Sequence, residues 1–347
     1  MSRRVPLALI ASCVAALLAA SAVVHGQNGA TRSGAARSAV LRTLDGQPDL
    51  QGFWTNDTVT PLERPAEFGD KEILTPDEAA AYAKKRLDQF LAQPKDNIHY
   101  DDAIWQAESY SKESNRRTSL IVEPRTGRLP PLTPAAQKRE AAKAAARKGT
   151  DPSDSVQTRT LAERCITWGN VGPPMIPPTY NANLQIMQTR DMVVIIHEMM
   201  HDVRMIPLDP SRGDGSAHPS AKVQFLAGDS RGRWEGDTLV VDTTNFTEKT
   251  NFRGPPLTTR QDIAATETMH VVERFTRVDR DTIRYQFTVE DPNTWTTPWS
   301  GEIAIRRWDG PIYEYACHEG NYGLANILRA ARVDDAKKAK SARPSSN

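Results

Sequence analysis

The stretch Thr282-Ile283-Arg284-Tyr285-Gln286-Phe287-Thr288-Val289-Glu290 decides the fold class of this chain. Its apolar side chains alternate with polar ones, and successive side chains of an extended strand point to opposite faces of a sheet. The run therefore predicts a strand with one buried face and one exposed face. The turn residues Asp279-Arg280-Asp281 directly before it indicate that the preceding strand enters by a tight turn.

Similar runs of period two lie on both sides of this stretch, from about residue 183 to residue 317. Turn residues such as Glu235-Gly236-Asp237 and Asp309-Gly310 separate them. Short strands in sequence order predict an antiparallel meander, and closure removes its open edges. We therefore expect a mainly β fold, an antiparallel meander that closes into a barrel or a strongly curved sheet. The expected strands are Leu184–Arg190, Met192–His197, Val203–Pro207, Thr238–Thr243, Thr268–Val278, Thr282–Glu290, Trp299–Trp308 and Ile312–Cys317.

Two helices are expected near the N-terminus, inserted ahead of the strands. Thr75-Pro76-Asp77-Glu78 is a capping box that opens a helix to about Leu91, and Thr133-Pro134 opens a second one that ends near Gly149. A short strand is expected at Thr118–Val122 and a further strand entry at Pro48–Trp54, while a short C-terminal helix covers Asn326–Lys338. The sequence thus predicts one β-rich domain over 46–330 with a helical segment at 75–149. The end of the last helix and a polar tail follow over 331–347.

The N-terminus has the order of a secretory signal peptide. Arg3 and Arg4 precede the apolar run Val5–Val24, and small residues stand before Gln27. We expect cleavage after residue 26, a flexible lead-in over 27–45, and a secreted or periplasmic protein without a stable membrane span. An uncleaved anchor is one alternative, because the run is close to membrane-span length. A lipoprotein attached through Cys13 is the other.

Charge and cysteine content narrow the class further. The full chain has a formal net charge of +1, and removal of two arginines with the leader makes it slightly negative. A balanced charge argues against a nucleic-acid partner, which needs a basic face. Outside the leader only Cys165 and Cys317 remain, and in an oxidising compartment they are expected to form one disulfide. Two buried free thiols are the alternative.

Four stretches together resemble a family of secreted β-rich proteins abundant in soil acidobacteria and some proteobacteria. They are Pro48–Trp54, Val171–Met175 running into Asn181, Trp234–Phe246, and Asp291-Pro292 with Trp295–Trp299. The resemblance covers nearly the whole mature chain. It implies export and a β-rich fold, and it implies no particular reaction.

His197-Glu198-Met199-Met200-His201 matches the H-E-x-x-H signature of zinc metallopeptidases. In that chemistry a helix places both imidazoles on one face and the glutamate activates a metal-bound water. The β-branched run before His197 instead favours a strand, on which the two imidazoles would lie about 13 Å apart. They could meet only if residues 198–200 form a turn. No metal is favoured, and zinc held by His197 and His201 stays the alternative.

Two further groups could carry chemistry. His318 and Glu319 follow the last expected strand, where His318 could act as an acid or base at a pocket rim or simply belong to an anchored loop. Trp295 and Trp299 offer flat apolar faces near carboxylates, a combination that holds sugars and other rings, although aromatic residues of β-proteins are mostly core. The carboxylates of that second group are Asp291 and Glu302.

These observations predict a secreted or periplasmic protein with a pocket for a small organic ligand, apolar or saccharide-like. Binding alone and a hydrolase or lyase activity both remain open, with His197, Glu198, His201, His318 and Glu319 as candidate catalytic residues. A zinc-dependent metallopeptidase is the enzyme alternative, and a non-enzymatic interaction protein of the envelope is the other. No cofactor is expected. The ligand and the oligomeric state are left open.

Overall fold

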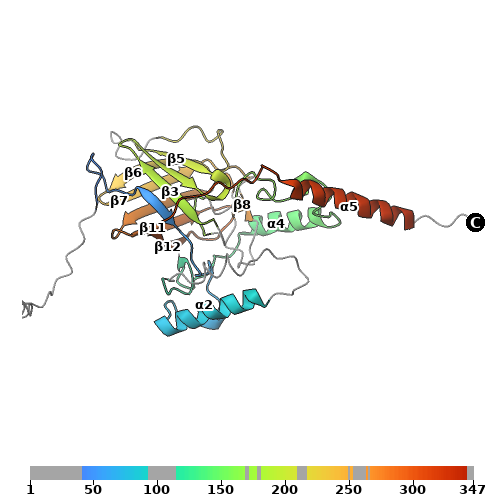
Figure 1. Cartoon of the computed structure of the whole chain (residues 1–347), viewed down its shortest axis with the longest axis horizontal. Helices are drawn as coiled ribbons and strands as arrows, with labels where there is room; N and C mark the ends of the chain where they lie inside the picture. Colours follow the sequence, from blue (N-terminus) through green and yellow to red (C-terminus); the bar gives the residue numbers. More distant parts are fainter. Residues whose placement is uncertain are drawn as a thin grey trace, which may run out of the picture. The chain divides into compact units, whose positions relative to one another are not determined.

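The computed structural model describes residues 41–92, 115–168, 172–177, 181–208, 217–248, 251–252, 263–264 and 266–341. The described residues belong to one compact unit (Figure 1). The expected signal peptide at 1–26, including Cys13, lies outside the described residues, and so does most of the lead-in at 27–45.

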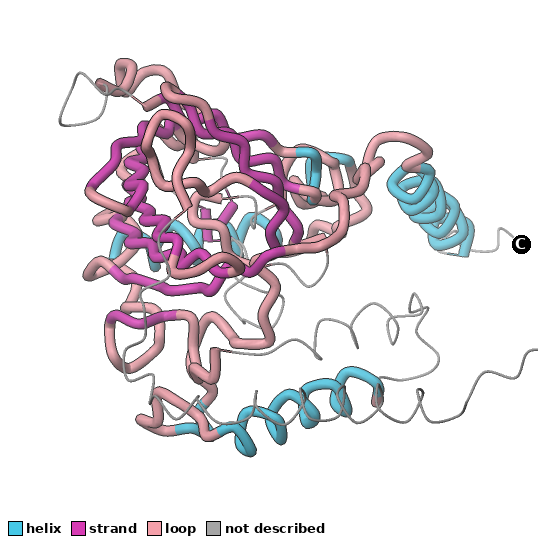
Figure 2. Tube along the Cα trace, turned by 60° about the vertical axis from the view of Figure 1, so that its left-hand side comes forward, coloured by secondary structure: helices cyan, strands magenta, loops and turns pink. Residues whose placement is uncertain are grey.

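Ten strands form one sheet that is nearly closed into a barrel, which confirms the expected fold class (Figure 2). The neighbours in order are β5-β4-β3-β1-β12-β11-β10-β7-β6, each pair antiparallel, and β2 also pairs with β12. The two ends of this order approach each other through a parallel bridge between Leu208 and Gly232. The strands are β1 (Gly52–Thr55), β2 (Ile121–Glu123), β3 (Asn183–Gln188), β4 (Met192–His197), β5 (Val203–Pro207), β6 (Asp229–Glu235), β7 (Thr238–Thr244), β10 (His270–Arg277), β11 (Thr282–Glu290) and β12 (Trp299–Arg307), with β8 (Asn251–Phe252) and β9 (Ile263–Ala264) as a separate pair.

The meander runs in sequence order within two parts, β3-β4-β5 and β6-β7-β10-β11-β12. Strand β1 joins these parts, because it pairs with β3 on one side and with β12 on the other. A strand that is distant in sequence therefore completes the barrel wall between its two halves. Local periodicity carries no information about such a pairing, so the sequence predicted the hairpins but not this insertion.

The barrel interior contains the inward side chains of the alternating strands. Ile283, Tyr285, Phe287 and Val289 of β11 are each at most 2% exposed, as their alternation predicted. Aromatic rings continue across neighbouring strands, with centroid distances of 4.9 Å from Phe275 to Tyr285 and 5.6 Å from Tyr285 to Phe287. The interior is thus a packed core.

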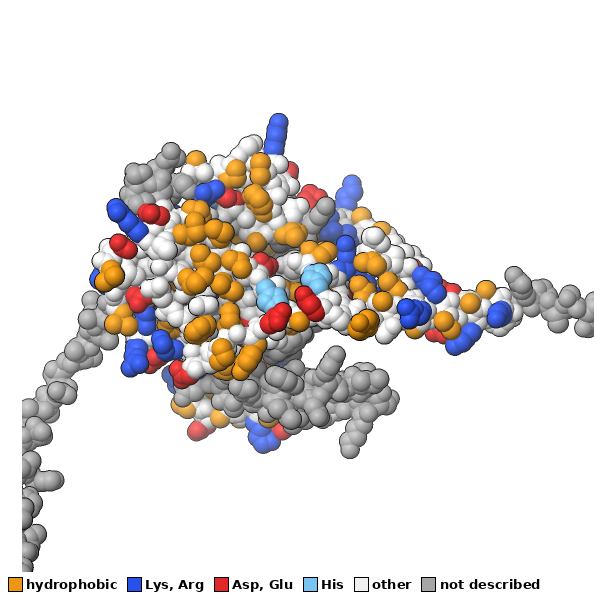
Figure 3. All heavy atoms as spheres, turned by 45° about the horizontal axis from the view of Figure 1, so that its top comes forward, with side chains coloured by type: hydrophobic (Ala, Val, Ile, Leu, Met, Phe, Trp, Pro, Cys, Tyr) orange, Lys and Arg blue, Asp and Glu red, His pale blue; other side chains and the backbone are white. Residues whose placement is uncertain are grey.

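The outward side chains of the first meander are apolar in part. Met187, Val203 and Met205 on β3 and β5 are 40–60% exposed, whereas Val193 and Ile195 on β4 point inward. Figure 3 shows a face of the molecule on which hydrophobic side chains gather.

Strand β6 was not among the expected strands. Its inward positions are Ser230 and Gly232 and its outward positions are Arg231 and Arg233, so it lacks the apolar alternation that marks a strand. Gly232 is required here, because a Cβ atom would lie 2.6 Å from Leu208 Cδ2 and 2.9 Å from Ile206 Cγ2. The close approach of the two barrel ends explains the glycine.

The two N-terminal helices begin where their capping residues predicted. Helix α2 (Pro76–Leu91) follows Thr75, whose backbone N–H donates to Glu78 Oε2 at 2.8 Å while Glu78 N–H donates to Thr75 Oγ1 at 3.3 Å. Helix α4 (Pro134–Arg147) follows Thr133, whose hydroxyl accepts from Ala136 N–H at 3.1 Å. No helix among the described residues combines the length and apolar composition needed to cross a membrane.

The expected C-terminal helix at Asn326–Lys338 is confirmed and lies within the longer helix α5 (Tyr322–Ser341), which has 20 residues. One expectation near the C-terminus is wrong. Residues Ile312–Cys317 form no strand, although the segment was expected to be one. The reason lies in its hydrogen-bond partners, which are side chains rather than a neighbouring strand.

Candidate functional site

The extended segment Pro311–Cys317, here called the C-terminal arm, is held at every second residue. Tyr313 N–H donates to Glu198 Oε2 at 3.1 Å, and Tyr315 N–H donates to His201 Nε2 at 2.7 Å. Cys317 forms the expected disulfide with Cys165, with a Cα–Cα distance of 5.7 Å. Because backbone N–H groups of an extended chain alternate in direction, this spacing fixes one edge of the arm.

Glu198 and His201 of the H-E-x-x-H match are two of these anchors. Strand β4 ends at His197, and the short helix η3 (Met199–His201) turns the chain into β5, with Met200 and His201 at positive φ. Glu198 is buried and also accepts from the side-chain amides of Asn181 at 2.6 Å and Asn183 at 3.2 Å. Its carboxylate is therefore surrounded by donors that hold the arm and the start of β3.

His197 points the other way, into the barrel. It is 3% exposed, whereas His201 is exposed and contacts the arm, so the turn does not bring the two imidazoles together. Among the described residues, no three His, Cys, Asp or Glu side chains are placed to hold one metal ion. His197 Nε2 is buried with no hydrogen-bond partner among the described residues. Burial, together with the nearby Arg204 charge, lowers the pKa of His197 to about 3.

A buried polar network lies beside His197. The Arg204 guanidinium contacts both carboxylate oxygens of Glu273, at 3.0 and 2.5 Å, and donates to Ser230 Oγ at 3.2 Å. Tyr285 Oη donates to Glu273 Oε1 at 2.7 Å and accepts from the backbone N–H of Met175 at 2.9 Å. Burial lowers the pKa of Arg204, but the Glu273 charge more than offsets this, so the net direction is upward. The Arg204 guanidinium therefore stays protonated inside the barrel.

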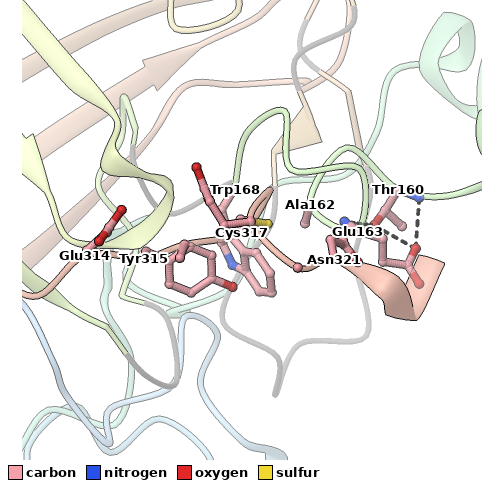
Figure 4. Close-up of a pocket in the computed structure, with 11 residues that line it drawn as sticks. Thr160, Ala162, Glu163, Trp168, Glu314, Tyr315, Cys317 and Asn321 are labelled. Atoms are coloured by element: carbon pink, nitrogen blue, oxygen red, sulfur yellow. Dashed lines mark hydrogen bonds between the residues drawn. The ribbon is translucent and has the colours of Figure 1, made fainter. Parts of the chain in front are cut away.

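The arm and the turn around Cys165 border an open cleft of about 670 Å³, which is within the range of small-molecule sites (Figure 4). Trp168 and Tyr315 lie together at its centre, next to the disulfide. Glu163 and Asn321 lie toward one end and Glu314 toward the other. The lining residues are Thr160, Ala162, Glu163, Trp168, Glu314, Tyr315, Ala316, Cys317, Glu319, Gly320 and Asn321.

Three carboxylates give the cleft a negative character. Glu163 accepts from Thr160 N–H and from the Thr160 hydroxyl, both at 3.0 Å, and pairs with Arg159 at 3.1 Å. Partial burial raises the pKa of Glu163, but these hydrogen bonds and the Arg159 charge outweigh burial and lower it. Glu314 and Glu319 are exposed side chains of the cleft lining.

The five expected catalytic residues do not form one site. Glu319 lines the cleft, while His318 is exposed beside it and is not part of its lining. Glu198 and His201 lie behind the arm and position it, and His197 lies in the barrel core.

The expected ligand-binding aromatics are core residues. Trp295 is 5% and Trp299 1% exposed, and their rings pack edge to face at 6.4 Å. Asp291 is buried and accepts from the hydroxyls of Thr266 at 2.6 Å and Thr294 at 2.7 Å. Glu302, on the outer side of β12, accepts from Gln286 Nε2 at 2.9 Å. The structure therefore places this group away from the cleft lining.

Trp168 and Tyr315 were not among the residues singled out from the sequence. The sequence did contain a pointer to these two aromatic residues. The expected disulfide joins Cys165 and Cys317, and each aromatic residue stands within three positions of one of these cysteines. Comparison with known proteins found no matching family model, curated protein or solved structure.

Proposed function

We propose that the chain is an exported protein that binds a small organic cation in the cleft between 160–168 and 314–321. The lining supports this proposal, since Trp168 and Tyr315 stand among three glutamates and the described lining contains no Lys, Arg or His. Export is supported by the disulfide, which persists in oxidising compartments. The leader and the resemblance noted above point the same way.

The ligand class follows from the chemistry of the walls. A cation over the face of a tryptophan or tyrosine ring gains about 0.5–1 kcal/mol at an exposed site, and more when it is desolvated. Carboxylates add Coulomb attraction, and an open cleft lets a polar headgroup stay hydrated. A purely apolar ligand would offer no opposite charge to the exposed carboxylates of Glu314 and Glu319, and a neutral sugar would use only their hydrogen-bonding capacity.

Binding is favoured over a zinc peptidase by the contacts of the H-E-x-x-H residues. The Glu198 carboxylate is occupied by three donors, and His201 Nε2 accepts the N–H of Tyr315. These contacts support a positioning role, in which the motif holds the wall that carries Glu314 and Tyr315.

Calorimetric titration with a matched pair of probes tests the proposal. Choline and its uncharged carbon isostere 3,3-dimethylbutan-1-ol have the same shape, and tryptamine and glucose extend the set. We expect the two cations to bind and the isostere and glucose to bind at least about tenfold more weakly. Glu319→Gln should weaken choline binding, whereas Glu267→Gln, which removes an exposed carboxylate outside the cleft lining, should not.

Each outcome that contradicts the proposal has a different meaning. Equal affinity for choline and its isostere would show that the cleft binds small molecules but does not select for positive charge. Tighter binding of glucose than of choline would show that the ligand is a saccharide and not a cation. Absence of binding by every probe at millimolar concentration would reject the cleft as the ligand site.

A further inference from the structure

A second group of ionisable side chains lies on the outer wall of the barrel, apart from the cleft lining. His218 Nδ1 is 2.7 Å from Asp229 Oδ2, and His218 Nε2 is 3.0 Å from Asp242 Oδ1. The other oxygen of Asp242 is 2.9 Å from His270 Nε2, and Glu290 lies 3.6 Å from His270 Nδ1. Acids and imidazoles thus alternate across β6, β7, β10 and β11, and we call these five residues the Asp242 cluster.

The hydrogen-bond geometry of this cluster requires bound protons. An ionised carboxylate can only accept, and a neutral imidazole has one N–H and one lone pair. His218 has a carboxylate oxygen within hydrogen-bond distance of each ring nitrogen, so both contacts are hydrogen bonds to ionised carboxylates only when both nitrogens donate. If His218 loses its proton, one of its nitrogen lone pairs faces a carboxylate oxygen and that contact becomes repulsive.

The contact between His270 and Asp242 favours the charged form of both side chains. The hydrogen bond with Asp242 raises the pKa of His270 above its ordinary value, partial burial opposes this, and the charges of Asp242 and Glu290 add to it. Partial burial raises the pKa of Asp242, but the contacts with His270 and His218 outweigh burial and lower it. The central carboxylate of Asp242 is therefore stabilised by its contacts with both imidazoles.

His218 attaches the segment Ala217–Gly228 to the wall. Two further attachments of this segment use the uncharged Asn245, whose Nδ2 donates to Pro219 O at 3.1 Å and whose backbone carbonyl accepts from Phe225 N–H at 2.9 Å.

The charged groups that face His218 are Asp229 and Asp242. Arg231 on β6 pairs with Asp229 at 2.7 and 2.8 Å, and Arg274 on β10 pairs with Glu235 at 2.9 Å.

We propose that the Asp242 cluster is a proton-operated latch that holds segment 217–228 against the barrel wall and loosens its His218 end when the imidazoles lose their protons. The contacts of Asn245 with Pro219, Ser220 and Phe225 do not titrate, so they remain after His218 is released and keep the segment on the wall. An exported protein meets the pH of its surroundings directly, and histidine is the side chain whose charge changes near neutrality. The sign follows from linkage, because attachment that depends on bound protons is strongest at low pH and weakens as pH rises.

Hydrogen exchange of the full chain, corrected for intrinsic exchange rates, tests the latch. Between about pH 6 and about pH 8.5 we expect the protection of 217–222 to fall by up to about tenfold per pH unit, while β11 stays unchanged. In His218→Gln the protection of 217–222 should be low at both pH values and should no longer depend on pH. His318→Gln, which changes an exposed histidine outside the cluster, should behave as the wild type.

Two results would overturn the latch. One is protection that does not depend on pH in the wild type or that persists in His218→Gln. The other is protection that responds to added zinc or to a chelator at fixed pH, which would assign the cluster to a metal. If His218→Gln fails to fold, Asp242→Asn removes the shared acceptor charge and should give the same loss of pH dependence.

Discussion

At the scale of single residues, His197 and His270 couple protonation to stability with opposite signs. His197 is buried beside Arg204 and its pKa is lowered to about 3, whereas His270 lies against Asp242 and its pKa is raised. Below pH 6.5, the ordinary histidine pKa, His197 therefore binds a proton in the unfolded chain, whereas in the folded protein it stays neutral down to about pH 3. At His270 the folded state keeps its proton to higher pH, so stabilisation there is present at low pH and is lost as pH rises.

We predict that His197→Phe makes the protein less sensitive to acid. Below about pH 6.5 the wild type loses stability by at most about 1.4 kcal/mol per pH unit, because only the unfolded state takes up this proton. Between about pH 7 and about pH 5, urea unfolding should show the wild type losing on the order of 2 kcal/mol more than His197→Phe. His318→Gln is the control and should lose as much as the wild type. An identical acid dependence in His197→Phe would show that His197 takes up its proton in the folded state.

At the scale of elements, the C-terminal arm shows how side chains replace a neighbouring strand. We predict that Glu198→Gln destabilises the protein by about 1–3 kcal/mol, because Asn181, Asn183 and Tyr313 all donate to this carboxylate and an amide NH₂ cannot accept. Denaturant unfolding measures the loss, and limited proteolysis should detect a loosened arm. Glu314→Gln, on the same arm but in the cleft, should leave stability unchanged. Unaltered stability in Glu198→Gln would contradict the positioning role.

The elements also show what the sequence could predict and why. The β11 alternation, both helix starts and the Cys165–Cys317 bond follow from local chemistry or from elimination, and all three are confirmed. Strand β6 and the arm follow from contacts between distant residues, such as Gly232 with Leu208 and Tyr315 with His201. The Asp242 cluster is of the same kind, since its histidines stand 52 residues apart in the sequence and contact the same Asp242 carboxylate only in the folded chain. Glu319, a candidate catalytic residue from the sequence, lines the cleft, whereas Trp168 and Tyr315 were not singled out.

At the scale of the whole molecule, the buried Arg204–Glu273 pair connects the two meanders through the interior. Arg204 belongs to β5 at one end of the sheet order, and Glu273 belongs to β10 in the other part. The same guanidinium reaches Ser230 on β6, where the barrel is joined by the bridge between Leu208 and Gly232. Both partners are at most 4% exposed, so neither charge can be solvated if the other is removed.

We predict that Glu273→Gln alone destabilises the protein by about 3–5 kcal/mol, because it leaves the Arg204 charge buried without a counter-ion. Arg204→Met alone should have a similar effect through the unpaired Glu273 carboxylate. The double variant Arg204→Met with Glu273→Gln should be more stable than either single variant, since the desolvation of both charges is then relieved. A double-mutant cycle by denaturant unfolding measures this coupling, and the exposed Lys84–Asp88 pair of α2 supplies a control with a coupling below about 0.5 kcal/mol. Additive losses at Arg204 and Glu273 would mean that the two charges act independently and that the pair does not hold the barrel closed.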